Sequence, residues 1–109
     1  MRDLFGTWTG SWEGLGASGG FELVLERGKD GMPKGRVSVT GEPTYSAELK
    51  TLSLEDGKLV ATYDFPPDDQ IEVDLTATFQ GKSAAGTWTA RQRADRTELA
   101  SGSWTVMRQ

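Results

Sequence analysis

The sequence predicts an all-β fold, an antiparallel up-and-down meander of eight strands closed into one small barrel domain over residues 1–109. Apolar and polar residues alternate with a period of two along most of the chain, which is typical of strands with one buried face. The connections are short and rich in Gly, Pro and Asp, and no stretch has a useful helical period. A chain of 109 residues can build one core but not two.

The clearest predicted strand is 71–80, where apolar residues at odd positions alternate with polar residues at even positions. A parallel sheet covered on both faces would be apolar throughout, so this alternation favours antiparallel pairing. The same pattern predicts the other strands at residues 5–13, 21–26, 35–40, 44–50, 58–65, 83–91 and 97–108.

The parity of the apolar residues changes after the fourth of these strands. Tyr45 and Leu49 share one parity, whereas Leu52 and Leu54 have the opposite one. We therefore expect a β-bulge near Lys50-Thr51 that bends one long strand.

The connections predict tight turns. Asp56-Gly57 is the strongest hairpin signal, because both residues tolerate the positive φ of a two-residue turn. Glycine-rich residues 15–20 are expected to form a mobile connection between the first two strands. Further turns are predicted at residues 28–33, 41–43, 65–69, 80–82 and 93–95. Tight turns join antiparallel neighbours, and closure removes the exposed edges of an open meander. A barrel is therefore favoured over the alternative, a two-sheet β-sandwich.

All four tryptophans follow a glycine by two positions, so that each Gly–Trp pair shares one face of its strand. Small barrels alternate small and large inward residues to fit bulky rings into a tapering interior. The pattern occurs near both ends of the chain, where the first and last strands would pair. Its four copies are Gly6-Thr7-Trp8, Gly10-Ser11-Trp12, Gly86-Thr87-Trp88 and Gly102-Ser103-Trp104.

The opening Gly6-Thr7-Trp8 and the basic residue that ends the last strand, Arg108, resemble the arrangement of the calycin superfamily. That superfamily includes the lipocalins, the fatty-acid-binding proteins and the avidins. The whole chain is similar to small lipocalin-like domains of bacterial secreted proteins. The resemblance implies that Trp8 packs against Arg108 and closes one end of the barrel. The ligand contacts of the avidins have no counterpart in this chain, so biotin binding is not implied.

Composition excludes several classes of function. A net charge of −4 argues against a nucleic-acid partner, which needs a basic face. The absence of Cys and His excludes Ser-His-Asp and Cys-His catalysis and every Cys/His metal site. No apolar run is long enough to span a bilayer, so membrane insertion is not expected. We expect a protein without catalytic activity and without a cofactor.

Two groups of charged residues are candidate sites. Three carboxylates share the outward parity and lack the spacing of a calcium loop, so they are predicted to face solvent: Asp64, Glu72 and Asp74. Three arginines flank one turn and are expected to pair locally with Asp95 and Glu98 rather than to bind an anion: Arg91, Arg93 and Arg96.

The inward face is apolar and rich in aromatic residues, which leaves two hypotheses. In the first, one open end of the barrel binds a small apolar or aromatic molecule. Its candidate contacts are Trp12, Tyr45, Tyr63, Trp88 and Trp104. In the second, the barrel is a filled structural or accessory domain with an interaction role. Strands this short favour a mostly filled interior, and the two tyrosines would be the polar groups of a pocket.

Overall fold

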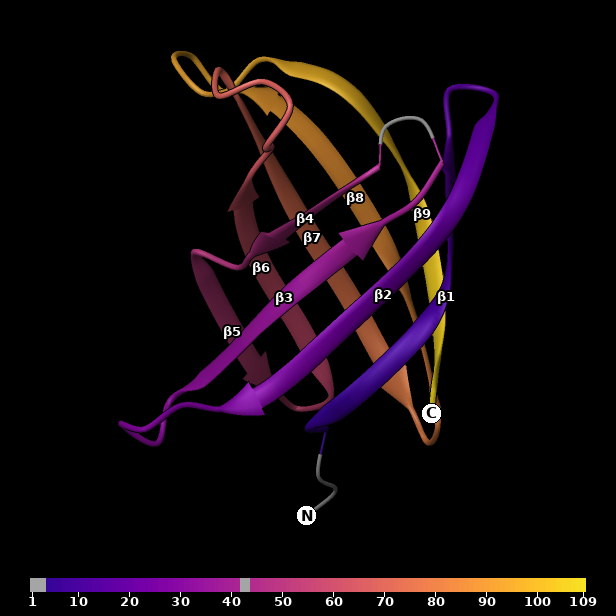
Figure 1. Ribbon diagram of the computed structural model, residues 1–109, viewed down its shortest axis with the longest axis vertical. Coiled ribbons are helices and arrows are strands. Elements are labelled where there is room, and N and C mark those ends of the chain that lie inside the picture. Colours follow the sequence, from indigo (N-terminus) through magenta and orange to yellow (C-terminus); the bar gives the residue numbers. More distant parts are fainter. Residues whose placement is uncertain (1–3, 42–43) are drawn as a thin grey trace.

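The computed structural model describes residues 4–41 and 44–109, which form nine antiparallel strands in one strongly curled sheet (Figure 1). The strands are β1 (Gly6–Gly14), β2 (Ala17–Arg27), β3 (Pro33–Val39), β4 (Tyr45–Glu48), β5 (Thr51–Glu55), β6 (Lys58–Asp64), β7 (Ile71–Gln80), β8 (Ser83–Gln92) and β9 (Glu98–Arg108). Their order across the sheet is β4-β3-β2-β1-β9-β8-β7-β6-β5. The all-β, antiparallel prediction is confirmed. The described part of the chain has no helix.

The prediction of a closed eight-stranded barrel is wrong, because the sheet is an open half-barrel whose edge strands are β4 and β5. The two edges are consecutive in the chain, separated by Leu49-Lys50. Leu49 donates its N–H to the carbonyl of Gly35 in β3 (2.9 Å), whereas Lys50 donates to Thr62 in β6 (2.7 Å). One bent segment therefore binds both sides of the opening without a ladder between β4 and β5. The two-sheet sandwich is not found either, since all the described strands belong to one sheet.

The bend occurs where the apolar parity changes. The predicted bulge near Lys50-Thr51 corresponds to the break between β4 and β5, so the location of the bend was predicted but its consequence was not. A bulge leaves both halves of a strand on the same neighbour. Here the halves pair with different neighbours, β4 with β3 and β5 with β6.

The first and last strands pair along the middle of the sheet, as the sequence predicts. In their register Trp8 faces Arg108, and Trp12 faces Trp104. The start of β1 and the end of β9 therefore lie at the same end of the half-barrel (Figure 1).

Of two predicted connections, one is confirmed by the structure and one is shorter than predicted. Asp56-Gly57 forms the predicted hairpin, with φ of 54° and 73°. The predicted mobile connection at 15–20 is wrong, because β2 begins at Ala17 and only Leu15-Gly16 form the turn. The predicted turn at 41–43 lies partly outside the described residues.

The interior is filled around Trp8, at the end that we call the filled end, and a second hollow at its rim is lined by Leu4, Leu54, Phe79 and residues 55–57 and 81. Trp8 is fully buried and makes an edge-to-face contact with Phe79 at 4.8 Å between ring centroids. The Arg108 guanidinium lies 4.6 Å from the Trp8 ring centroid, a cation–π arrangement. The Trp8 indole N–H donates to the Leu4 carbonyl (3.0 Å). No described polar or charged residue is fully buried, so the core of this end consists of apolar side chains, with the half-buried Arg108 at its edge.

Candidate functional site

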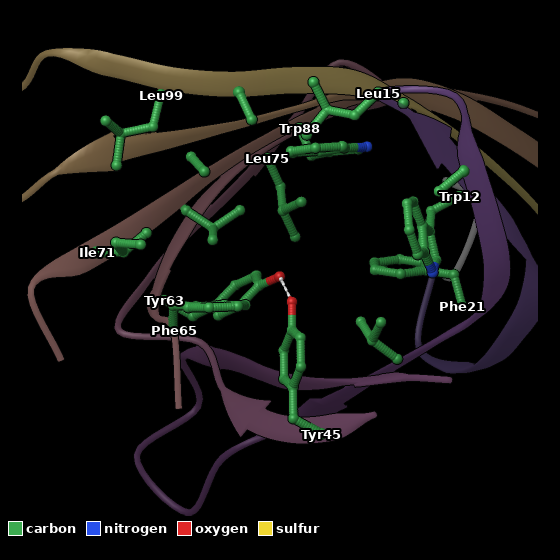
Figure 2. A pocket seen from close by; sticks show the side chains of 16 residues that line it. Trp12, Leu15, Phe21, Tyr45, Tyr63, Phe65, Ile71, Leu75, Trp88 and Leu99 are labelled. Atoms are coloured by element: carbon green, nitrogen blue, oxygen red, sulfur yellow. Dashed lines mark hydrogen bonds between the residues drawn. The ribbon is translucent and has the colours of Figure 1, made fainter. Parts of the chain in front are cut away.

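The opposite end of the half-barrel contains a cavity of about 300 Å³ that is open to solvent (Figure 2). It lies among the connections from β1 to β2, from β6 to β7 and from β8 to β9. No charged residue lines it among those described. Six of the lining residues are aromatic, namely Trp12, Phe21, Tyr45, Tyr63, Phe65 and Trp88; the others are Gly14, Leu15, Ala17, Val39, Ile71, Val73, Leu75, Ala90, Leu99 and Ala100.

Trp12 and Trp88 form one wall of the cavity. Their rings meet edge to face, with centroids 6.2 Å apart. The indole N–H of Trp12 donates to the Thr40 carbonyl (3.2 Å), and that of Trp88 donates to the Glu13 carbonyl (3.1 Å). Because both N–H groups are bound to the backbone, the indoles offer mainly apolar surface to a ligand.

A glycine on the neighbouring strand makes room for each of these indoles. Trp12 faces Gly19 across β1 and β2, and Trp88 faces Gly102 across β8 and β9. A Cβ at Gly19 would lie 2.7 Å from Trp12 Nε1, and one at Gly102 would lie 2.6 Å from Trp88 Nε1. Each of these tryptophans therefore needs a glycine at the facing position of the neighbouring strand.

The Tyr45 and Tyr63 hydroxyls are joined by a hydrogen bond of 2.6 Å between the two oxygens (Figure 2). Tyr45 is on β4 and Tyr63 on β6, so this bond spans the opening of the sheet from inside. The Tyr45 ring also packs edge to face on Phe65, with centroids 5.1 Å apart. Burial raises the pKa of both phenols above the usual value of 10.0, and the neighbouring Tyr45 raises that of Tyr63 further. Both hydroxyls are therefore neutral at physiological pH.

Four of the five candidate contact residues line the cavity: Trp12, Tyr45, Tyr63 and Trp88. The fifth, Trp104, is only 1% exposed and packs against Phe21 with centroids 4.9 Å apart. Its indole N–H donates to the Thr87 carbonyl (3.0 Å). Trp104 thus belongs to the packed core and supports the cavity through Phe21.

The sequence did not identify Ala90 and Ala100, whose small side chains leave space in the cavity, or Leu15, which lies at its mouth. Ala90 and Ala100 face each other on β8 and β9 and line the cavity with small side chains. Their inward parity and small size were the available signal. Leu15 was expected in a mobile connection, yet it lies in a tight hairpin and lines the cavity.

Leu15 has a φ of 56° and is 78% exposed, although leucine disfavours the left-handed region. With Gly16 at φ 73°, the turn has the two positive φ angles for which Asn-Gly is the preferred sequence. The substitution Leu15→Asn should therefore raise the free energy of unfolding by about 1 kcal/mol. Urea denaturation measures this change. Leu99→Asn, at an exposed site of β9 near the same cavity mouth, is the control and should give no gain.

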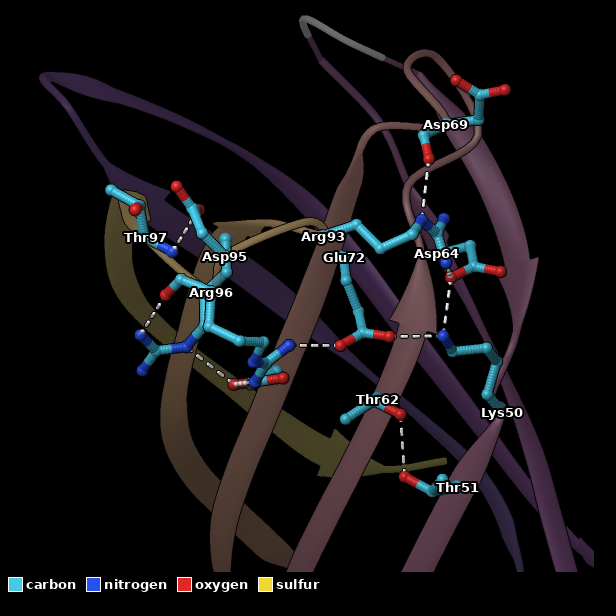
Figure 3. Close-up of polar contacts among 12 residues, drawn as sticks. Lys50, Thr51, Thr62, Asp64, Asp69, Glu72, Arg93, Asp95, Arg96 and Thr97 are labelled. Atoms are coloured by element: carbon cyan, nitrogen blue, oxygen red, sulfur yellow. Dashed lines mark hydrogen bonds and ion pairs between the residues drawn. The ribbon is translucent and has the colours of Figure 1, made fainter.

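Charged side chains on the outer face form a second cluster, which we name the outer ion-pair network (Figure 3). Its cations and anions come from the β4–β5 link, β6, β7, β8 and the β8–β9 turn. The pairs are Lys50–Asp64 (2.8 Å), Lys50–Glu72, Arg93–Asp64 (2.8 Å), Arg96–Glu72, Arg96–Asp74 (2.7 Å) and Arg91–Asp74 (2.9 Å).

The network confirms that the three carboxylates lie on the outer face and corrects their partners. The described ion pairs join the arginines to carboxylates of β6 and β7 rather than to Asp95 or Glu98, and the Asp95 carboxylate accepts the backbone N–H of Thr97 (3.0 Å). The described residues contain no group of acidic side chains able to hold a metal ion. On the outside, Lys50 connects the β4–β5 link to β6 and β7, at the same opening that the tyrosines span from inside.

Substitution of Lys50 by Met should lower stability in a pH-dependent way. Hydrogen bonding to Lys50, and secondarily to Arg93, lowers the pKa of Asp64 below 3.8, so this stabilisation is lost as the pH falls through that lowered pKa. Hydrogen bonding to Asp64 and Glu72 raises the pKa of Lys50 above 10.5, so it is also lost in stronger alkali. Melting temperatures of the wild-type protein and of Lys50→Met, measured from pH 2 to pH 11, should therefore differ most at pH values between the lowered pKa of Asp64 and the raised pKa of Lys50.

The exposed Lys29, in the turn before β3, supplies the control for this series. Lys29→Met removes the same charge without disturbing the network. A difference of equal size and equal pH dependence for both variants would show that net charge, and not the network, is responsible.

Comparisons with protein-family models, with curated proteins and with solved structures give no match for this chain. Among the described residues, no helix has the length and hydropathy needed to cross a membrane. The geometry of the cavity is therefore the basis on which a function can be proposed.

Proposed function

We propose that the protein is a non-catalytic binding protein for a small apolar or aromatic molecule, which occupies the cavity at the open end of the half-barrel. The observation that carries this proposal is a cavity of about 300 Å³ with six aromatic side chains and no charged side chain among the described residues of its wall. Ligand sites are typically concave and mostly apolar, with few polar groups, and span about 300–1,000 Å³. A fully packed domain of this size would have no such space.

The cavity volume limits the size of the ligand. An apolar cavity of about 150 Å³ in another protein holds benzene. A cavity of about 300 Å³ suits a molecule of about two fused rings, which the faces of Trp12, Trp88 and Phe65 can contact. The neutral tyrosines donate hydrogen bonds better than they abstract protons, which favours binding over acid–base chemistry.

Two features support a relationship to the calycin barrels as part of this proposal. The first and last strands pair, and Arg108 lies on the Trp8 ring at the filled end. We regard the half-barrel as a shortened, open form of that lipocalin-like architecture, with the ligand at the end opposite the Trp8–Arg108 contact.

The test is a titration with benzene, toluene, naphthalene and cyclohexane, followed by calorimetry and tryptophan fluorescence. We expect at least naphthalene to bind and to change the emission of Trp12 and Trp88. The variant Ala90→Phe places a ring in the cavity and should weaken binding at least about tenfold. Ala85→Phe, at an exposed site of the same strand, should leave it unchanged. No heat and no emission change across the panel would refute the proposal.

A further inference from the structure

We infer that the ligand is a flat, neutral aromatic molecule that carries one hydrogen-bond acceptor, and that this acceptor binds the hydroxyl pair of Tyr45 and Tyr63. The inference rests on the proposed function and adds the chemical class of the ligand. It follows from counting donors in the cavity wall.

The tyrosine pair has one donor more than it uses. Each phenol has one O–H donor, and its oxygen also accepts. The single bond between the two hydroxyls uses one proton, and neither oxygen has another partner among the described residues. One O–H therefore remains. Figure 2 shows the two hydroxyls meeting among the mostly apolar side chains that line the cavity. This O–H lies in the wall of a cavity that is open to solvent, where an acceptor on a bound ligand can replace water and avoid the cost of leaving the donor unpaired.

The other polar hydrogens of the aromatic wall are already used. The indole N–H groups of Trp12 and Trp88 bind the carbonyls of Thr40 and Glu13. The tyrosine pair is thus the one unused side-chain donor among the described residues of the cavity. A ligand that lies flat against the rings would be oriented by this donor alone, which makes Tyr45 and Tyr63 the residues that determine specificity.

The residues that line the cavity also indicate that the acceptor group of the ligand is uncharged. No Lys or Arg lines the cavity among the described residues, and Arg91, which follows the lining residue Ala90 in the chain, pairs with Asp74 in the outer ion-pair network. A carboxylate in the cavity would be desolvated without a counter-ion, which is strongly unfavourable. Burial raises the pKa of both tyrosines, so the pair presents neutral O–H groups. A carbonyl, an ether or a ring nitrogen fits, whereas an acid does not.

The experiment compares naphthalene with quinoline and isoquinoline, which have the same shape and one ring nitrogen. Calorimetry gives the dissociation constants for the wild-type protein and for the double variant Tyr45→Phe/Tyr63→Phe. The measured quantity is the ratio of the dissociation constant of naphthalene to that of the nitrogen heterocycle that binds more tightly. Comparing this ratio between the two proteins removes the contribution of free-ligand hydration, because that contribution is the same for both proteins. We expect the double variant to lose this preference by about tenfold, the value of one hydrogen bond. Naphthalene itself should bind the double variant at least as tightly.

The single variants sharpen the test, because each of them retains one hydroxyl with a free proton. Tyr45→Phe and Tyr63→Phe should keep the preference that the double variant loses. The anion 2-naphthoate should bind the wild-type protein more weakly than naphthalene. If naphthalene binds but the preference is the same within twofold in wild type and double variant, or if 2-naphthoate binds more tightly, this inference is wrong and the proposed function stands. If no neutral aromatic probe binds, both are wrong.

Discussion

Replacing Trp8 with alanine should lower the free energy of unfolding by about 3–5 kcal/mol, the usual loss for a buried tryptophan. The side chain is fully buried and packs on Phe79, so its removal leaves a large cavity in the filled end. The Arg108 guanidinium would lose the ring beneath it, and the Leu4 carbonyl would lose its donor. Urea denaturation followed by far-ultraviolet circular dichroism measures the change independently of the missing fluorophore.

Two variants test whether the effect belongs to this position. Trp88→Ala removes the same side chain from the partly exposed wall of the cavity and should cost clearly less. Arg108→Ala removes the cation over Trp8 and the hydrogen bond to the Phe5 carbonyl (2.8 Å), which should cost about 1–2 kcal/mol. Unchanged stability in both Trp8→Ala and Arg108→Ala would contradict the role of this contact in closing the filled end.

Replacing Gly86 with alanine should be as damaging as the loss of Trp8, with a cost of at least about 3 kcal/mol. A Cβ at this position would lie 1.7 Å from the Thr76 carbonyl oxygen and 2.6 Å from the Ala77 Cα. Both atoms belong to the backbone of β7, so no side-chain rotation can relieve the clash. The strands β7 and β8 would have to separate at this point of close approach, and thermal unfolding should show a much lower midpoint.

Gly81→Ala separates this steric effect from the general effect of removing a glycine. Gly81 lies in the turn between the same two strands, with φ at 63°, and a Cβ at this position would meet only open space. The substitution should cost only about 1 kcal/mol, from the strained backbone. Equal losses for Gly86→Ala and Gly81→Ala would mean that the close approach of β8 to β7 does not require glycine.

Most of the strands could be predicted because their signal is local. The strict alternation over 71–80 matches β7 from its first residue to its last, and Asp56-Gly57 forms the expected hairpin. Alternation depends only on which side chains are apolar, and turn type depends only on which residues accept positive φ. The same reasoning placed Tyr45 and Tyr63 on the inward face, where the structure brings their hydroxyls together.

The candidate site was only partly predictable, because a cavity depends on what neighbouring strands contribute. Parity correctly turned Trp12 and Trp104 inward, yet one lines the cavity and the other lies in the core. The two residues face each other on β1 and β9, so no local pattern distinguishes them. The difference arises because Phe21 packs on Trp104.

The sequence by itself determined an antiparallel β-sheet with one apolar face, joined first strand to last, because alternation and turn chemistry act over a few residues. Only the tertiary structure decided that the sheet stays open. Leu49 and Lys50 are neighbours in the chain, yet they bond to β3 and β6, which lie near opposite edges of the sheet in its strand order. The sheet curves because the small twists between neighbouring strands add up along it. The cavity exists only where this curvature places facing side chains too far apart to fill the space between them.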